Sequence, residues 1–190
     1  MRTITKDELK HNPRLLAELK KSIFIYPTDT IYGIGCDAAN QELVAKVRNI
    51  KKSYNQPFSI IIPNKNMIYE YCKTNNKTRE WVDKLPGAYT LIMRLKNKKK
   101  RFFAPNVNPR DDTIGIRIPN HWFYKYVKKM KTPILTTSAN ITGGDFMTSQ
   151  ENLNPDLQKQ VSFMINQGEI KGRPSTIVHL EGKKVKVQKR

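Results

Sequence analysis

Hydroxyl-bearing side chains gather in two short segments of the sequence, each beside an apolar run. The first segment is YPTDTIYGIGCDA, residues 26–38, and the second is ILTTSANITGG, residues 134–144. Hydroxyls, glycines and consecutive backbone amides can surround phosphate oxygens and other small polar groups. Because open α/β folds bind ligands at the carboxyl ends of their strands, we expect Thr136, Ser138 and Asn140 to lie at a binding site. An ordinary turn or strand end rich in these residue types is the alternative for both segments.

The first segment also contains a glycine pattern, because Gly33, Gly35 and Ala38 fit the G-x-G-x-x-A form of the dinucleotide fingerprint. That fingerprint needs its glycines directly between a strand and a helix, with an acidic residue about 20 positions later to hold the ribose. No Asp or Glu occurs between Lys46 and Met67, and the P-loop pattern G-x-x-x-x-G-K-[ST] is absent. We therefore reject an NAD site here.

Arg117 is a candidate ligand for an anion. It lies in TIGIRIP, where it alternates with isoleucines, so Thr113, Gly115 and Arg117 should share one face of a strand. A guanidinium held on a strand suits bidentate recognition of a carboxylate or a phosphate. A solvated arginine on an open sheet face is the alternative.

Two further segments give weaker signals. Ser175 leads into a predicted strand in RPSTIVHL, and Lys51 and Lys52 end a predicted amphipathic helix. The lysine pair could bind a phosphate, although a solvated charged face is the more frequent meaning of such a pair.

Predicted helices and strands that would position these residues alternate along the chain. Hydrophobic periodicity predicts helices over 6–20, 41–52, 66–73, 78–85, 121–130 and 154–160, and strands over 22–26, 58–63, 89–95, 113–119, 133–139, 175–181 and 183–189. We therefore expect a single α/β domain over residues 1–190, with a twisted mixed β-sheet flanked by helices. Residues 96–112 lack a periodic pattern and are predicted to form a mobile loop, a candidate lid.

The composition limits the protein class. Lys and Arg outnumber Asp and Glu by 35 to 16, a net charge of +19, which favours polyanions but is spread along the whole chain. Two cysteines and three scattered histidines make a zinc site or a disulfide framework improbable. Without a bilayer-spanning apolar stretch or a signal peptide, we expect a soluble cytoplasmic protein with no membrane contact.

Taken in order, these segments resemble the Sua5/YrdC/TsaC family of threonylcarbamoyl-AMP synthases. The matching stretches are PTDTIYGIGCDA, IKK…NQPF, LPGAYTLIM, TIGIRIP, TTSANITGG and RPSTIV, which span residues 26–178. Members of this family join L-threonine, bicarbonate or CO2, and ATP, and release pyrophosphate. A separate transferase complex then moves the threonylcarbamoyl group to adenosine 37 of tRNA, forming t6A. The resemblance implies a YrdC-like fold and a nucleotidyltransferase activity, and contact with tRNA is a further expectation.

The resemblance also implies roles for particular residues. Thr30, Arg117 and Thr136 would hold the threonine, with Arg117 on its carboxylate. Lys51 and Lys52 would offset phosphate charge during transfer, together with Mg²⁺ bound mainly through substrate oxygens and water. Because the sequence shows no nucleophile beside a base, we expect catalysis by positioning and charge neutralisation. The ATP site would be completed by Gln56, Thr113, Ser138, Asn140 and Ser175.

One segment departs from the family pattern. Where the family has K-x-R-P, this chain has Lys51-Lys52-Ser53-Tyr54, so the arginine is missing or replaced by Lys52, and Arg48 is a candidate substitute. Lysine supplies charge to a phosphate but not the planar fork of arginine. Two alternatives therefore stay open: a family member that binds nucleotide without turnover, and a basic RNA-binding module, although RNP-type and KH-type signatures are absent.

Overall fold

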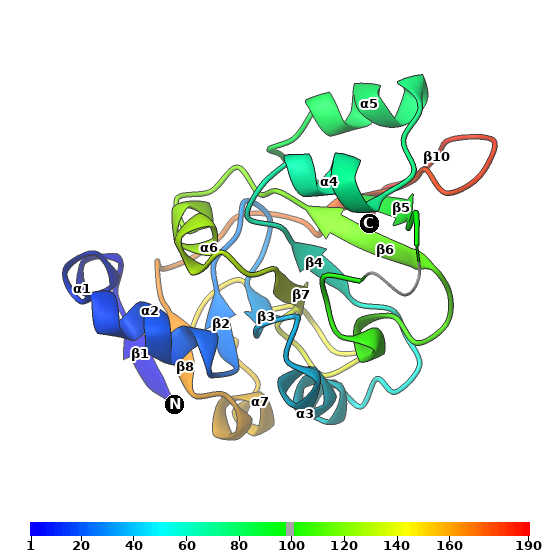
Figure 1. The fold of residues 1–190 in the computed structure, drawn as a ribbon. Helices are drawn as coiled ribbons and strands as arrows, with labels where there is room; N and C mark the ends of the chain where they lie inside the picture. The colour runs from blue at the N-terminus through cyan, green and yellow to red at the C-terminus, as the bar shows by residue number, and fades with distance from the viewer. Residues whose placement is uncertain (98–100) are drawn as a thin grey trace.

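The computed structural model describes residues 1–97 and 101–190, and a mixed 10-stranded sheet runs through them (Figure 1). The strand order is β1-β8-β2-β3-β7-β4-β6-β5-β9-β10. β3 runs antiparallel to both β2 and β7, whereas β4 and β6 are parallel, which confirms the expected mixed sheet. The strands are β1 (Arg2–Ile4), β2 (Phe24–Tyr26), β3 (Gly33–Gly35), β4 (Ser59–Ile61), β5 (Tyr89–Arg94), β6 (Thr113–Arg117), β7 (Ile134–Ser138), β8 (Phe163–Ile165), β9 (Thr176–His179) and β10 (Lys186–Gln188).

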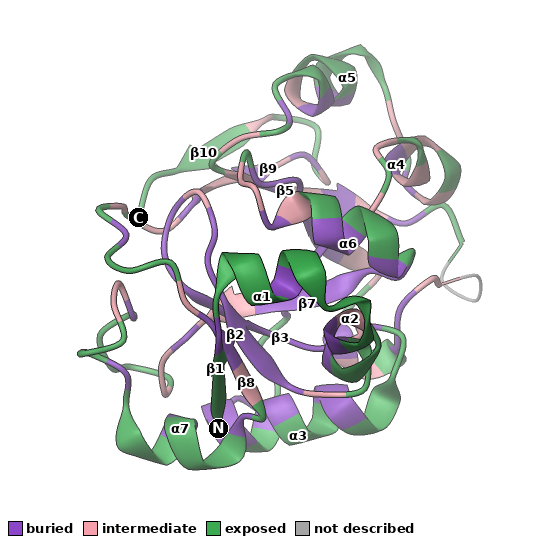
Figure 2. Ribbon diagram, turned by 90° about the vertical axis from the view of Figure 1, so that its left-hand side faces the viewer, coloured by how far each residue is buried: buried purple, intermediate pink, exposed green. Residues whose placement is uncertain are grey.

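Helices pack on both faces of this sheet, and their apolar residues form two buried clusters (Figure 2). One face, here called the α3 face, packs against α3 (Gln41–Lys51), α4 (Asn66–Tyr71), α5 (Asn76–Asp83) and α7 (Pro155–Gln160). The other, the α6 face, packs against α1 (Lys6–His11), α2 (Pro13–Lys20) and α6 (Tyr124–Met130). Neighbouring residues of β4 alternate between the clusters, as a strand requires: Ile60 joins the first and Ile61 the second.

The helical pattern predicted over residues 6–20 forms two helices, α1 and α2, because the chain breaks at Asn12. Pro13 has no backbone N–H and occupies the first turn of α2, where none is needed. The side chain of Asn12 caps this second helix by accepting a hydrogen bond from the Arg14 amide at 3.1 Å. β1, β3 and β8, which have 3 residues each, were not predicted.

The predicted mobile loop over residues 96–112 is wrong for its second part, residues 101–112. A 3₁₀ helix, η1, spans Pro105–Val107, and both Val107 and Asn108 are buried. The Phe58 amide donates to the Val107 carbonyl at 2.9 Å, which joins this segment to the start of β4. Lys98, Lys99 and Lys100 lie outside the described residues.

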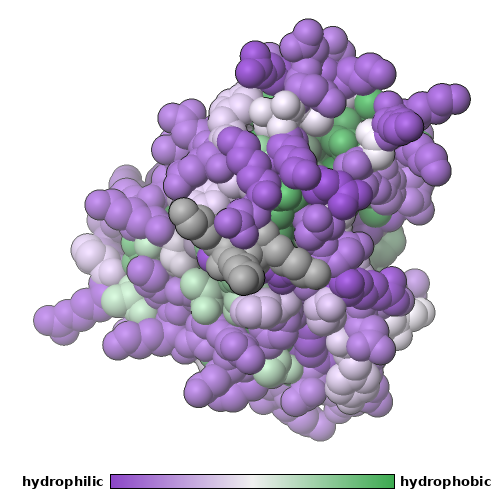
Figure 3. All heavy atoms as spheres, turned by 45° about the vertical axis from the view of Figure 1, so that its right-hand side comes forward, coloured by the Kyte–Doolittle hydropathy of each residue, from purple (hydrophilic) through white to green (hydrophobic). Residues whose placement is uncertain are grey.

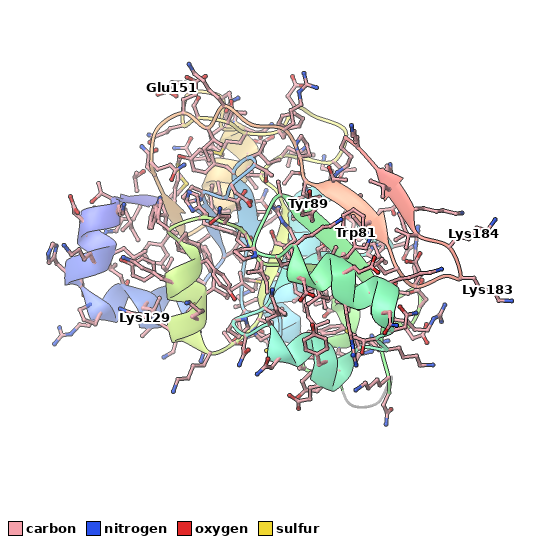
Figure 4. All side chains as sticks on the ribbon, turned by 90° about the horizontal axis from the view of Figure 1, so that it is seen from above. Trp81, Tyr89, Lys129, Glu151, Lys183 and Lys184 are labelled. Carbon is pink, nitrogen blue, oxygen red and sulfur yellow. The ribbon has the colours of Figure 1, made fainter. Side chains whose placement is uncertain are left out.

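Hydrophilic side chains dominate the surface in the view of Figure 3, with small hydrophobic patches between them. Lysines project from separate elements: Lys129 from α6, and Lys183 and Lys184 from the turn before β10 (Figure 4). The positive charge is therefore spread over the molecule. Among the described residues, no helix is long and apolar enough to cross a membrane.

Candidate active site

A cavity of about 440 Å³ opens on the α6 face of the sheet, where strands from distant parts of the sequence meet. Side chains two residues apart on a strand point to the same face of the sheet. Ile61 and Ile134 belong to the cluster on the α6 face, so Ser59 and Thr136 point to that face as well, and both line the cavity. Of the residues predicted for the site, the cavity is lined by Thr113, Arg117, Thr136, Ser138 and Ser175.

Arg117 is buried at the cavity wall, with 7% of its surface exposed. Its Nη2 donates to Asp29 Oδ1 at 3.0 Å and to Thr30 Oγ1 at 3.1 Å. The buried Nε has no protein partner. A solvated arginine is therefore excluded, and the remaining donors of this guanidinium suit a carboxylate or a phosphate oxygen.

Thr30 contacts Arg117 but is not itself among the cavity-lining residues. The Thr28 hydroxyl donates to the Ile31 carbonyl at 2.7 Å, so in the 2.8 Å contact between the two threonines Thr30 must be the donor. The Thr30 oxygen then accepts from Arg117. In this arrangement Thr30 orients the guanidinium, while its predicted contact with threonine stays a prediction.

Lys51 connects the end of α3 to the end of β7 from behind the cavity wall. Its Nζ donates to the Ser138 carbonyl at 2.8 Å and to Asn140 Oδ1 at 2.6 Å. The Asn140 oxygen also accepts from the Ser138 hydroxyl at 2.7 Å. Burial lowers the pKa of Lys51 to about 8. Lys51 and Asn140 thus hold Ser138 in place, and neither lines the cavity.

The segment after Lys51 is fixed by Arg48 instead of by a phosphate ligand. All three guanidinium nitrogens of Arg48 donate to backbone carbonyls, those of Ser53, Tyr54, Gln56, Asn106 and Val107. Arg48 is therefore not a substitute for the missing arginine. Lys52 ends α3 in the left-handed region, with φ of 49°, and both Lys52 and Gln56 have exposed side chains that do not line the cavity.

The structure adds wall residues that the sequence reasoning missed. Arg190 lines the cavity, where its Nε and Nη2 donate to the Ser175 carbonyl and hydroxyl, both at 3.1 Å. The Ser175 hydroxyl also contacts Thr90 Oγ1 at 2.7 Å. His179 lines the cavity too, and its Nδ1 lies 3.0 Å from Glu181 Oε1. Alternation through VKVQKR could have placed Gln188 and Arg190 on one face.

The cavity suits anionic guests. Two guanidinium groups, those of Arg117 and Arg190, line it together with several hydroxyls, and no Asp or Glu is among the described residues of its wall. Burial and the nearby charge of Arg117 both lower the pKa of Arg190. Asp29 pairs with Arg117 at 3.0 Å without lining the cavity, so the charge of Arg190 and the unpartnered Nε of Arg117 remain to attract anions such as a carboxylate and a phosphate.

Comparisons with known proteins show relatives in sequence and in fold. A protein of Methanocaldococcus jannaschii is 37% identical over 180 residues, 90% of this chain and 83% of the relative. The human threonylcarbamoyl-AMP synthase is 30% identical over 158 residues, and the match covers 82% of this chain but only 55% of the human protein. The crystal structure of P. abyssi Sua5 complexed with L-threonine superposes with a TM-score of 0.82 at 21% identity, over 98% of this chain and 56% of that one, and shows the shared fold.

The match to a protein family extends over nearly the whole chain. The model of the Sua5/YciO/YrdC family, described as telomere recombination, matches residues 19–190, which include every residue of the cavity wall. The chain therefore belongs to the Sua5/YciO/YrdC family.

Proposed function

We propose that the protein is a threonylcarbamoyl-AMP synthase, which makes threonylcarbamoyl-AMP and pyrophosphate from L-threonine, bicarbonate or CO2, and ATP. The observation that carries the proposal is the buried Arg117, which lines a cavity without a lining carboxylate and whose Nε has no protein partner. A relative with that name, the human enzyme, supports it. As a nucleotidyltransferase, the protein would supply threonylcarbamoyl-AMP for the formation of t6A on tRNA.

The reaction needs two anionic substrates beside each other. The carboxylate of threonine would bind Arg117, which leaves the amine free to form a carbamate. The amine attacks the carbon of CO2 and releases a proton, or attacks bicarbonate and water is lost. A carbamate oxygen then attacks the α-phosphorus of ATP, and the bond to pyrophosphate breaks. Positioning of this kind can supply much of a rate enhancement without a covalent intermediate.

The nucleotide would occupy the part of the cavity lined by Thr113, Ser138 and Ser175. Lys51 would act on the phosphates through its charge and through Ser138, which it holds by the carbonyl. Lys52 and Gln56 keep their proposed roles as contacts at the rim, because Pro57 and Phe58 of the same segment line the cavity. Asn140 would contribute through its hydrogen bond with Ser138.

Magnesium would enter with ATP. No group of three or more His, Cys, Asp or Glu side chains that could hold a metal ion occurs among residues 1–97 and 101–190. A site held mainly by phosphate oxygens and water fits Mg²⁺ in such surroundings, since this ion keeps much of its hydration. When bound, it would offset phosphate charge.

The product would pass to a threonylcarbamoyl transferase complex, and we propose the cytoplasm as the location. A contact with tRNA itself is proposed only from the net charge of +19. The lysines that carry this charge project from several elements (Figure 4). Salt-sensitive binding of tRNA is the measurement that tests this contact.

Pyrophosphate release tests the proposed function. Incubation of the protein with ATP, threonine and bicarbonate should give pyrophosphate and threonylcarbamoyl-AMP, and omission of threonine or bicarbonate should abolish both. ATP binding without turnover would instead identify a family member that has lost the activity. RNA binding without ATP turnover would identify a basic RNA-binding module.

A further inference from the structure

Tyr26 crosses a neighbouring strand to reach the cavity wall. It lies on β2 opposite Gly33 of β3, and Gly33 lies opposite Ser138 of β7. The phenol hydroxyl nevertheless donates to Thr136 Oγ1 on β7, at 2.6 Å, although β3 runs between the two strands. Tyr26 is completely buried and does not line the cavity, whereas Thr136 does.

The two glycines of β3 make room for this crossing. A Cβ atom on Gly35 would lie 2.8 Å from Tyr26 Cε1, and one on Gly33 would lie 3.2 Å from Tyr26 Cζ. The other side of the ring stacks on Phe123, with centroids 5.2 Å apart. The glycine pattern that fits a dinucleotide fingerprint in sequence therefore has another physical use, because a Cβ atom at Gly35 would require the Tyr26 ring or the Leu135 backbone to shift.

The hydrogen bond between Tyr26 and Thr136 fixes the direction of the Thr136 hydroxyl. Burial raises the pKa of Tyr26 to about 12, against the opposing effects of the Thr136 hydrogen bond and the Arg117 charge, so the phenol keeps its proton. Since the Thr136 oxygen accepts this hydrogen bond, the hydrogen of the Thr136 hydroxyl is free for another partner. Among the described residues, the Thr136 hydroxyl has a hydrogen bond with Tyr26 and donates to no protein acceptor, and Thr136 lines the cavity.

Arg117 presents a second free donor at the same end of the cavity. Its charge is close enough to act on the Tyr26 phenol, and its buried Nε lacks a partner. The ammonium group of an amino acid has no lone pair to accept hydrogen bonds from the Thr136 hydroxyl and Arg117 Nε, whereas its carboxylate can accept from both. We propose that Tyr26 is a positioning residue that makes Thr136 a hydrogen-bond donor to the carboxylate of the bound amino acid. This inference rests on the proposed function, since it concerns the threonine substrate.

Tyr26→Phe tests the inference, because it removes the hydroxyl and keeps the ring. We expect the KM and the calorimetric Kd for L-threonine to rise about fivefold, as loss of one neutral hydrogen bond implies, while kcat and the KM for ATP stay within about twofold. Tyr126→Phe is the matched control. Tyr126 belongs to the same aromatic cluster, but its buried hydroxyl has no partner, so threonine binding should not change.

Thr136→Val shows whether Tyr26 acts through Thr136. In the valine background, Tyr26→Phe should have no further effect on threonine Kd, because the hydroxyl that it orients is gone. Unchanged threonine Kd in Tyr26→Phe, or equal effects of Tyr26→Phe in the parent and in the Thr136→Val background, would overturn the inference alone. A parent protein that binds no threonine would overturn the proposed function with it.

Discussion

Replacement of Asp29 by asparagine removes one charge from the buried ion pair that holds Arg117. The two side chains are only 9% and 10% exposed, and Asp29 Oδ1 accepts from Arg117 Nη2 at 3.0 Å. Asp29 Oδ2 accepts from the Asn120 amide at 2.9 Å, so one carboxylate connects the turn after β2 to the chain that leaves β6. Asparagine has the same shape, but it can keep only one of these two acceptor positions.

The cost of this change follows from the burial of the pair. Loss of one partner leaves the Arg117 guanidinium buried without its counter-charge, which typically destabilises a protein by 3–5 kcal/mol. Since the remaining amide oxygen can still accept one bond, we expect the lower end, about 3 kcal/mol. For a chain of this size, that loss corresponds to a fall in Tm of about 6 to 12 °C.

Urea and thermal unfolding of Asp29→Asn measure this loss, and Asp112→Asn is the control. Asp112 lies 2.9 Å from Arg94, but the side chains of that pair are 42% and 35% exposed, so its removal should cost less than about 1 kcal/mol. If both variants lost the same small amount, the buried pair would not be holding Arg117, and the orientation inferred for the guanidinium would be wrong.

Three further predictions concern the charged groups of the site and its surroundings. Arg117→Ala should raise the threonine KM at least about tenfold and leave ATP binding nearly unchanged, by calorimetry, because a charged hydrogen-bonding partner is lost. Burial lowers the pKa of Lys51 to about 8, so its positive charge is lost above that pH. The rate of ATP turnover should therefore decrease above about pH 8, and in Lys51→Arg this decrease should occur at higher pH. Burial lowers the pKa of His121, against the opposing Gln167 hydrogen bond and Asp29 charge. The folded protein therefore binds fewer protons at low pH than the unfolded chain does. The free energy of unfolding should drop between about pH 7 and pH 5, and this drop should be smaller in His121→Gln.

Much of the cavity wall could be predicted from strand periodicity. Alternation along TIGIRIP places Thr113 and Arg117 on one face, and both line the cavity. Thr136 and Ser138 follow from the end of an apolar strand in the same way. These positions depend on local pattern alone, and local pattern is what a single sequence contains.

The remaining contacts depend on strand pairings that no local pattern encodes. Arg190 reaches Ser175 only because β10 pairs antiparallel with β9 and places Gln188 opposite Ile177. The crossing of Tyr26 over Gly33 needs the order β2-β3-β7, which joins segments more than 100 residues apart. The long side chain of Lys51 could point either to the cavity or behind it, and only the tertiary structure decides.

The absence of the family arginine after Lys51 does not remove guanidinium charge from the part of the cavity that we propose for the nucleotide, because Arg190 lines it. Arg48 is unsuitable because its three nitrogens donate to backbone carbonyls. Arg190 stands on the wall beside Ser175, and its planar group has a donor geometry that Lys52 cannot provide. Because the pKa of Arg190 is lowered by burial and by Arg117, an anion between the two arginines would relieve that repulsion. The substituted segment is therefore compatible with ATP binding in this chain.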